Sequence, residues 1–267
     1  MYAFTYHKPT SARQAATLLA KKEDAKLLAG GHTLLPTMKQ RLASPTALVD
    51  LGACPDLKGI SRKGRNLVIG AMTTHAEVAN SAEVQEAIPA LAFLAGSIGD
   101  PHVRHRGTIG GSVANNDPAA DYPAALLALG ATVITNKRKL TAEEFFTGLY
   151  ETALDDGEII TKVLFPLVSK AGYAKFRNPA SRYAMVGVFV AKRGSDIRVT
   201  VTGAGEGGVF RWAEAEAALK ARFAPKSLDG LKHTAKGING DIHADAEYRA
   251  HLIGVMAKQA VAQATGK

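Results

Sequence analysis

Hydrophobic and polar residues follow two different periods along this chain, and the change of period predicts where strands and helices lie. Short apolar runs bounded by polar residues or glycine predict strands, whereas apolar residues spaced three and four apart predict helices. The first fifty residues show a strand–loop–helix–strand order: AKLLA (25–29), a glycine pair, TLLPTMKQRL (33–42) and TALVDL (46–51). Ser11 and Gln14 have the spacing of a capping box, so an earlier helix is expected to begin at Ser11 and to reach about Lys22.

The middle of the chain mixes a hairpin pattern with helical periodicity. Residues 57–72 have the pattern of a β-hairpin. Thr74 and Glu77 then form a second capping box, and EVQEAIPALAFLAGSIG (83–99) continues with helical periodicity. The elements expected next are a helix at about 121–129, a strand at 131–135, a short helix capped by Thr141 and Glu144, and a strand at 158–166.

From about residue 171 the pattern changes to successive strands followed by helices. YAKFR, YAMVGVFVAKR and DIRVTVTGAG read as strands, and residues 212–223 and 245–264 read as helices. We therefore predict an α+β fold of three units, at 1–53, 54–170 and 171–267.

Composition excludes several classes of protein to which this chain could otherwise belong. No stretch approaches eighteen consecutive apolar residues, and the N-terminus lacks the basic and apolar regions of a signal peptide, so we expect a cytoplasmic protein without a membrane span. Cys54 is the one cysteine, which excludes an internal disulfide and a cysteine-ligated iron–sulfur or zinc site held by this chain alone. A redox function would need an organic cofactor or the metal centre of a partner.

The net charge of +9 does not by itself indicate nucleic-acid binding. The longest basic run is KRK at 137–139, and aromatic residues make up only 6% of the chain. We expect no nucleic-acid partner, because a cofactor phosphate, an acidic partner or solubility explains dispersed charge equally well.

Two glycine pairs stand in similar settings, Gly30-Gly31 in LLAGGHTLLP and Gly110-Gly111 in GTIGGSVANN. Glycine can adopt positive φ and brings the backbone close to a ligand, so that consecutive N–H groups converge on an anion. Two such loops facing each other would match a pyrophosphate. A tight turn explains either pair as well, and the residues alone leave both interpretations open.

Two other motifs are weaker. Residues 203–208 match the G-x-G-x-x-G pattern after a strand, with Asp229 about twenty residues further on, but VFRW separates the last glycine from the next helix. We therefore interpret them as a strand-to-helix connection. His102 and His105 have metal-ligand spacing, but arginines flank them and no third ligand is evident, so we predict no metal site. Arg104 and Arg106 are expected to brace the second glycine segment or a partner.

The chain resembles the FAD-binding medium subunit of molybdenum hydroxylases, the xanthine dehydrogenase and carbon monoxide dehydrogenase family. The resemblance rests on AGGHTLLPTMKQRL and DPHVRHRGTIGGSVANNDPAADYPAALLALGA, and it extends to FTYHKPTS, IGAMTTHAEV and YAKFRNPASRYAMVGV. It implies a fold of the vanillyl-alcohol-oxidase/PCMH type, with FAD between two α/β subdomains and a C-terminal domain, which has a small antiparallel sheet and helices, covering the flavin.

The resemblance also implies which residues bind FAD. A first pyrophosphate loop would comprise Ala29, Gly30, Gly31, His32 and Thr33, and a second Thr108, Ile109, Gly110, Gly111 and Ser112. Family members often have Asn where Ser112 stands. Ala114, Asn115 and Asp121 would contact the adenosine or ribityl part, and Lys175 and Tyr183 would lie near the isoalloxazine ring, where Ser181-Arg182 replace the usual acidic or glycine residues.

The function implied by the resemblance is electron transfer within a larger oxidoreductase. The chain would pass electrons from the [2Fe–2S] clusters of a small subunit through FAD to a terminal acceptor, while a large subunit carries the molybdenum cofactor and the substrate site. The expected assembly is a dimer of heterotrimers, and no catalytic residue is expected on this chain. Two alternatives stay open: a self-sufficient flavin oxidoreductase of the same fold, and a non-catalytic interaction protein.

Overall fold

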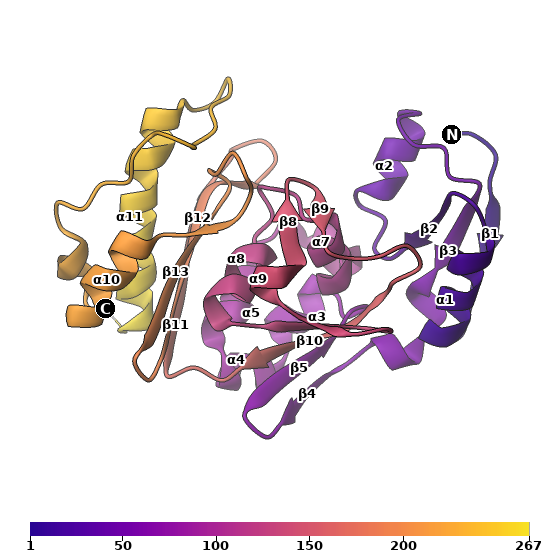
Figure 1. Ribbon diagram of the computed structural model, residues 1–267, viewed down its shortest axis with the longest axis horizontal. Helices are drawn as coiled ribbons and strands as arrows, with labels where there is room; N and C mark the ends of the chain where they lie inside the picture. Colours follow the sequence, from indigo (N-terminus) through magenta and orange to yellow (C-terminus); the bar gives the residue numbers. More distant parts are fainter. Residues whose placement is uncertain (267) are drawn as a thin grey trace.

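The computed structural model describes residues 1–266 and contains three main sheets that follow one another along the chain (Figure 1). The first is parallel, with the order β1-β3-β2, and the other two are antiparallel. Helices and sheets of both kinds confirm the α+β prediction. Among the described residues, no helix is both long enough and apolar enough to cross a bilayer.

The N-terminal sheet realises the predicted strand–loop–helix–strand unit. Its elements are β1 (Thr5–His7), α1 (Ala12–Lys21), β2 (Ala25–Leu28), α2 (Leu34–Lys39) and β3 (Ala47–Asp50), followed by two 3-10 turns at Leu51–Ala53 and Pro55–Leu57. The Ser11 side chain accepts the N–H of Gln14 and so begins α1. The full capping box predicted there was wrong, because the Gln14 side chain accepts from the N–H of Thr10 instead.

The central sheet has the order β4-β5-β10-β6-β7 and is joined by most of the helices. Its strands are β4 (Ile60–Lys63), β5 (Asn66–Gly70), β6 (Thr132–Thr135), β7 (Lys139–Thr141) and β10 (Ile160–Pro166). The accompanying elements are α3 (His75–Asn80), α4 (Ala82–Ala87), α5 (Pro89–Gly96), α6 (Pro101–Arg106), α7 (Ile109–Asn115), α8 (Tyr122–Leu129), α9 (Ala142–Phe145), β8 (Phe146–Gly148) and β9 (Glu151–Thr152).

The C-terminal sheet lies between two helical layers. It comprises β11 (Lys170–Arg177), β12 (Ala184–Arg193), β13 (Asp196–Thr202) and β14 (Phe210–Arg211), and the remaining elements are α10 (Ala213–Ala221), a 3-10 turn (Pro225–Leu228) and α11 (Ala246–Ala264). The long helix α11 packs on β11 and β12, and α8 contacts β12 and β13 (Figure 1). An apolar core of valine, alanine and isoleucine side chains joins the sheet to α10 and α11.

The G-x-G-x-x-G motif lies in the connection between β13 and β14. Gly203 and Gly208 have positive φ there, at 85° and 97°. Because β14 pairs antiparallel with β13 before α10 begins, the glycines turn the chain and do not open a helix. Asp229 forms an ion pair with Lys258, with 2.8 Å between Oδ1 and Nζ. The interpretation of this motif as a strand-to-helix connection is confirmed, with one short strand inserted.

Candidate functional site

The first glycine segment, residues 29–33, is a loop between β2 and α2. Gly31 has φ of +75°, a conformation that disfavours residues with a Cβ. The backbone N–H groups of residues 30–33 make no hydrogen bond within residues 1–266. Four consecutive free donors are an arrangement that can bind an anion.

The second glycine segment is helical, so the prediction of a loop at 108–112 was wrong. Thr108 caps α7, and its hydroxyl accepts the N–H of Gly111 at 3.1 Å. The N–H groups of Ile109 and Gly110 donate to the carbonyl oxygens of Thr73 and Ala71 at 3.1 and 2.8 Å. These donors are already used, and the two segments are therefore not equivalent nests for an anion.

Packing of the chain on itself explains two of the four glycines. A Cβ on Gly30 would lie 2.4 Å from the Arg106 carbonyl oxygen, and one on Gly110 would lie 2.7 Å from that of Ala71. A Cβ on Gly111 would instead meet the Thr108 hydroxyl at 3.0 Å and the Ala29 methyl at 3.5 Å, so it points toward the first segment. Gly111 is the glycine whose missing side chain keeps the space between the segments open.

Both segments line one cavity of about 730 Å³. This volume lies within the range of small-molecule and cofactor sites. The predicted site residues that line it are Ala29, Gly30, Gly31, His32, Thr33, Thr108, Gly110, Gly111, Ser112, Ala114, Asn115, Asp121 and Tyr183. Ile109 does not line it, because its side chain is fully buried in the adjacent core.

Two polar side chains on α7 are available to a ligand. Ser112 and Asn115 are three residues apart and therefore share a face of the helix. Within the described part of the chain, neither side chain has a hydrogen-bond partner, and both residues line the cavity. They can supply the hydroxyl and amide contacts that the backbone of this segment cannot.

Lys175 lies behind the cavity wall and not on it. Its ammonium group contacts the Asp121 carboxylate, with Nζ at 2.9 and 3.0 Å from the two oxygens, and donates to the Ser97 carbonyl at 3.2 Å. Tyr173 also donates its hydroxyl hydrogen to Asp121. The Asp121 and Lys175 side chains are almost fully buried. Lys175 thus fixes the orientation of Asp121, which faces the cavity.

Tyr183 lines the cavity from the loop between β11 and β12. Its side chain is half-exposed, and Arg182 beside it has φ of +62°, which is unusual for a residue other than glycine. Burial and the negative charge of Asp117 raise the pKa of Tyr183. The phenol therefore stays protonated near neutral pH, and the ring can close the opening over a planar ligand.

Sequence reasoning missed His75 and Glu158, which also line the cavity. Burial acts to raise the pKa of Glu158, but hydrogen bonds from Arg138, the Asp155 N–H and Thr135 outweigh it and lower the pKa to about 2. The capping box at Thr74 places His75 at the start of α3, but no sequence signal shows that this residue points inward. Only the tertiary packing brings both residues to the cavity.

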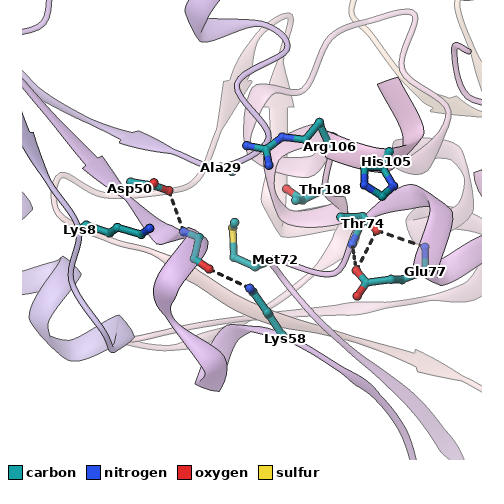
Figure 2. A pocket seen from close by; sticks show the side chains of 11 residues that line it. Lys8, Ala29, Asp50, Lys58, Met72, Thr74, Glu77, His105, Arg106 and Thr108 are labelled. Atoms are coloured by element: carbon teal, nitrogen blue, oxygen red, sulfur yellow. Dashed lines mark hydrogen bonds between the residues drawn. The ribbon is translucent and has the colours of Figure 1, made fainter. Parts of the chain in front are cut away.

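A smaller cavity of about 330 Å³ shares Ala29, Met72 and Thr108 with the larger one (Figure 2). Its Lys58 donates to the Gly52 carbonyl at 2.8 Å, and Glu77 is occupied in the capping box. Arg106 and His105 also line it, whereas Arg104 donates to the carbonyls of Ile98 and Gly99. Arg104 therefore braces the turn before α6. Arg106 lies beside the first glycine segment, and its carbonyl oxygen is the atom that packs against that segment.

The site suits a dinucleotide with a pyrophosphate. The first segment offers four free N–H groups, α7 offers a hydroxyl and an amide, and Gly111 leaves the space between them open. A buried carboxylate, that of Asp121, and the half-exposed ring of Tyr183 also line the cavity. No feature of this arrangement requires a metal, and residues 1–266 contain no group of three or more His, Cys, Asp or Glu side chains placed to hold one.

Known proteins share both the sequence and the fold. Residues 2–168 match the family described as FAD binding domain in molybdopterin dehydrogenase. The chain is 35% identical to the carbon monoxide dehydrogenase medium chain of Hydrogenophaga pseudoflava, over 97% of this chain and 96% of the relative. It is 36% identical to the nicotine 6-hydroxylase medium subunit of Paenarthrobacter nicotinovorans, over 98% of this chain and 97% of the relative.

Solved structures agree with these sequence matches. A reconstituted carbon monoxide dehydrogenase from Oligotropha carboxidovorans contains a chain that superposes with a TM-score of 0.89 at 33% identity, covering 99% of this chain and 98% of that chain. The family match spans more than half of the chain and includes both glycine segments. This chain therefore belongs to the FAD-binding family of the molybdopterin dehydrogenases, and its cofactor is FAD.

Proposed function

We propose that this chain is the flavoprotein subunit of a molybdenum hydroxylase, of the carbon monoxide dehydrogenase type or a related one. In this proposal, a small subunit with [2Fe–2S] clusters and a large subunit with the molybdenum cofactor complete a dimer of heterotrimers in the cytoplasm. The observation that carries the proposal is the cavity of about 730 Å³ that both glycine segments line, with Asp121 and Tyr183 on its wall. The relatives named as medium chain and medium subunit support membership of a larger complex.

Bound FAD would supply a two-electron store that can be filled one electron at a time and emptied to a terminal acceptor. The residues of this chain bind and orient that group. The free N–H groups of residues 30–33 would hold the pyrophosphate, and Ser112, Asn115 and the oriented carboxylate of Asp121 would contact its polar remainder. Tyr183 would cover the ring and limit access of water. The protein thus contributes positioning and electrostatics, and the cofactor contributes the redox chemistry.

The residues of this cavity do not determine which substrate the complex would oxidise. The two relatives of nearly equal identity are named for different activities, carbon monoxide dehydrogenase and nicotine 6-hydroxylase. This is expected if the substrate binds on the large subunit, whose residues vary independently of the flavin site.

The Gly111→Val variant tests the cavity assignment. Its side chain would enter the space between the segments without strain from a positive φ, so the purified variant is expected to lose FAD. Gly207→Val is a matched control, because nothing lies within 4 Å of a Cβ at Gly207. Flavin absorbance per protein is the measurement, and a wild-type flavin content in Gly111→Val would refute the assignment.

Gly31→Val is expected to lose FAD too, but Gly31 has φ of +75° and its Cβ would meet Leu35 at 2.9 Å, which adds a folding cost.

Co-purification tests the subunit assignment. The wild-type chain, expressed with its neighbouring gene products, is expected to retain molybdenum- and iron–sulfur-containing subunits. If the isolated chain oxidised a small-molecule donor at ordinary enzyme rates, the proposal would give way to a self-sufficient flavin oxidoreductase. A chain that neither carries nor takes up FAD would leave only an interaction protein.

A further inference from the structure

The smaller cavity, of about 330 Å³, lies where the three parallel strands of the N-terminal sheet end. Lys8 directly follows β1, Ala29 directly follows β2, and Asp50 is the last residue of β3. Because β1 and β2 both pair in parallel with β3, these three residues stand at the same edge of the sheet. Parallel sheets bind ligands outside the carboxyl ends of their strands, so this edge is a place where a ligand site is expected.

The rest of the wall comes from residues 52–108 and brings a second strong cation to the same space. These lining residues are Gly52, Lys58, Met72, Thr74, Glu77, His105, Arg106 and Thr108. The Lys8 ammonium and the Arg106 guanidinium point toward the space around Met72 from different sides (Figure 2). Lys8 follows a strand of the first sheet and Arg106 ends α6, so the fold brings these two charges together from distant parts of the sequence.

The cationic side chains of this cavity have free hydrogen-bond donors. In the part of the chain that the structure describes, Lys8 and Arg106 form neither a side-chain hydrogen bond nor an ion pair. Lys58 uses one donor, on the Gly52 carbonyl at 2.8 Å, and an ammonium group has three. The Thr108 hydroxyl accepts an N–H at 3.1 Å, so its own hydrogen is free to donate. These donors are available to a ligand.

The two carboxylates of the cavity are held by neutral groups and not by these cations. Asp50 accepts the Gly52 N–H on Oδ1 at 2.8 Å and the Tyr6 hydroxyl on Oδ2. Glu77 accepts the N–H and the hydroxyl of Thr74 on Oε2, at 2.7 and 2.8 Å, within the capping box of α3. Three cations therefore face two carboxylates that already have partners, and the excess of free donors favours an anion in the cavity.

We propose that the smaller cavity binds a phosphate group, as inorganic phosphate or as a small phosphate monoester. A guanidinium can hold two oxygens of a phosphate through parallel hydrogen bonds, and lysine ammonium groups bind phosphate as point charges. A phosphate group offers at least three acceptor oxygens to donors on several sides, whereas a carboxylate offers two. The volume of about 330 Å³ is at the lower end of the range for small-molecule sites.

This site is separate from the flavin cavity, although the two share part of their walls. Ala29, Met72 and Thr108 line both cavities. Residues 30–33, whose free N–H groups the proposed function gives to the FAD pyrophosphate, line only the larger one. A chain loaded with FAD should therefore still bind phosphate. The proposal concerns a second ligand and goes beyond the role of this chain as a flavoprotein subunit.

Calorimetric titration of inorganic phosphate into the FAD-loaded, full-length chain at fixed ionic strength tests this site. We expect one phosphate per chain. Arg106→Gln is expected to bind it roughly 10-fold more weakly or worse, and Lys8→Gln about 3-fold more weakly, as for lost hydrogen bonds from charged donors. Arg65→Gln and Lys63→Gln are matched controls, because they remove the same charges from exposed positions of the β4–β5 hairpin that line neither cavity. Both controls should stay within about 2-fold of wild type.

Each outcome decides for or against the site. Loss of phosphate binding in Arg106→Gln, with wild-type affinity in Arg65→Gln, supports it. Equal losses in these two variants would indicate a general effect of net charge and would overturn it, as would the absence of saturable binding in wild type. Phosphate binding that disappears when FAD is bound would place the anion in the flavin cavity and would also overturn it. Acetate titrated in the same way should bind more weakly, and equal or tighter binding of acetate would contradict the assignment to phosphate. Thermal unfolding reports whether each variant is folded, and Lys8→Gln decides if Arg106→Gln is not.

Discussion

The four glycines of the two segments satisfy different physical requirements. Gly30 and Gly110 allow the backbone to pack against other parts of the same chain, Gly31 allows a positive φ, and Gly111 leaves room in the cavity. The sequence shows the pairs but cannot distinguish these requirements, because the contacts at Gly30, Gly110 and Gly111 involve atoms far away along the chain. For Gly30 that atom belongs to Arg106, more than seventy residues later.

At the scale of single residues, His75 predicts a dependence of folding stability on pH. Its pKa is about 4 in the folded protein, against 6.5 for an unperturbed histidine. Between these values the unfolded chain binds a proton that the folded chain does not, so stability decreases as the pH falls from 6.5 to 4. The full effect is at most roughly 3 kcal/mol.

Urea unfolding of the FAD-free chain across this pH range would measure the effect, and His75→Gln should flatten it. An unchanged slope in that variant would assign the dependence to another group.

Glu158 affects folding stability in a separate and lower pH range. Its pKa is lowered to about 2, so its contribution to stability is complete above pH 4.5 and is lost as the pH falls toward 2.

The buried ion pair of Asp121 and Lys175 gives a second prediction at this scale. Lys175→Met would leave a buried carboxylate without its counter-ion, which is expected to cost about 3–5 kcal/mol in the free energy of unfolding. Adding Asp121→Asn removes the charge and should recover much of that loss. Urea denaturation of the two variants and wild type is the measurement. Equal stability of the single variant and wild type would show that Lys175 does not balance this charge.

At the scale of elements, most strands and capped helices were predicted within a few residues, and the exceptions have local causes. The stretch from Thr74 to Gly99 forms three helices and not a continuous one. The Ser81 hydroxyl accepts the Val84 N–H and so caps a new helix, and Pro89 starts another after Ile88. Ser81 and the Ile-Pro step both mark helix boundaries in the sequence. The apolar periodicity continues across them, and for that reason the boundaries were not predicted. The helix at 109–115 was missed because two glycines oppose it by propensity, and tertiary hydrogen bonds to Ala71 and Thr73 override that preference.

Gly172 predicts how closely α11 must lie on the C-terminal sheet. A Cβ there would be 1.9 Å from the Ala260 carbonyl oxygen, so Gly172→Ala would force the long helix away from β11. We expect a loss of about 3 kcal/mol or more in the free energy of unfolding. Gly207→Ala, where a Cβ meets nothing within 4 Å, should change stability little. Similar denaturation midpoints for the two variants would mean that the helix adjusts freely.

At the scale of the whole molecule, the cavity depends on segments that are far apart in sequence. Its wall includes Leu27 of the first sheet, Ile160 of the second, and Tyr183 before β12 of the third. The resemblance of the motifs to a known family predicted FAD, and all of the residues that it implied except Ile109 and Lys175 line the cavity, whereas composition and periodicity predicted only an anion site. His75 and Glu158 were missed because their inward orientation is a product of how the sheets assemble.

This arrangement predicts that FAD stabilises all three sheets together. A ligand that binds only the folded chain adds about 2.7 kcal/mol at 100 times its dissociation constant, which corresponds to roughly 5–10 °C in Tm for a chain of this size. Calorimetry at increasing FAD concentration should therefore show one transition that moves upward as a whole, because residues from Lys26 to Tyr183 line the cavity. The Gly111→Val variant should show no shift. Two transitions, of which only the first moved, would mean that the C-terminal sheet does not share in binding and that Tyr183 does not close the cavity over the flavin.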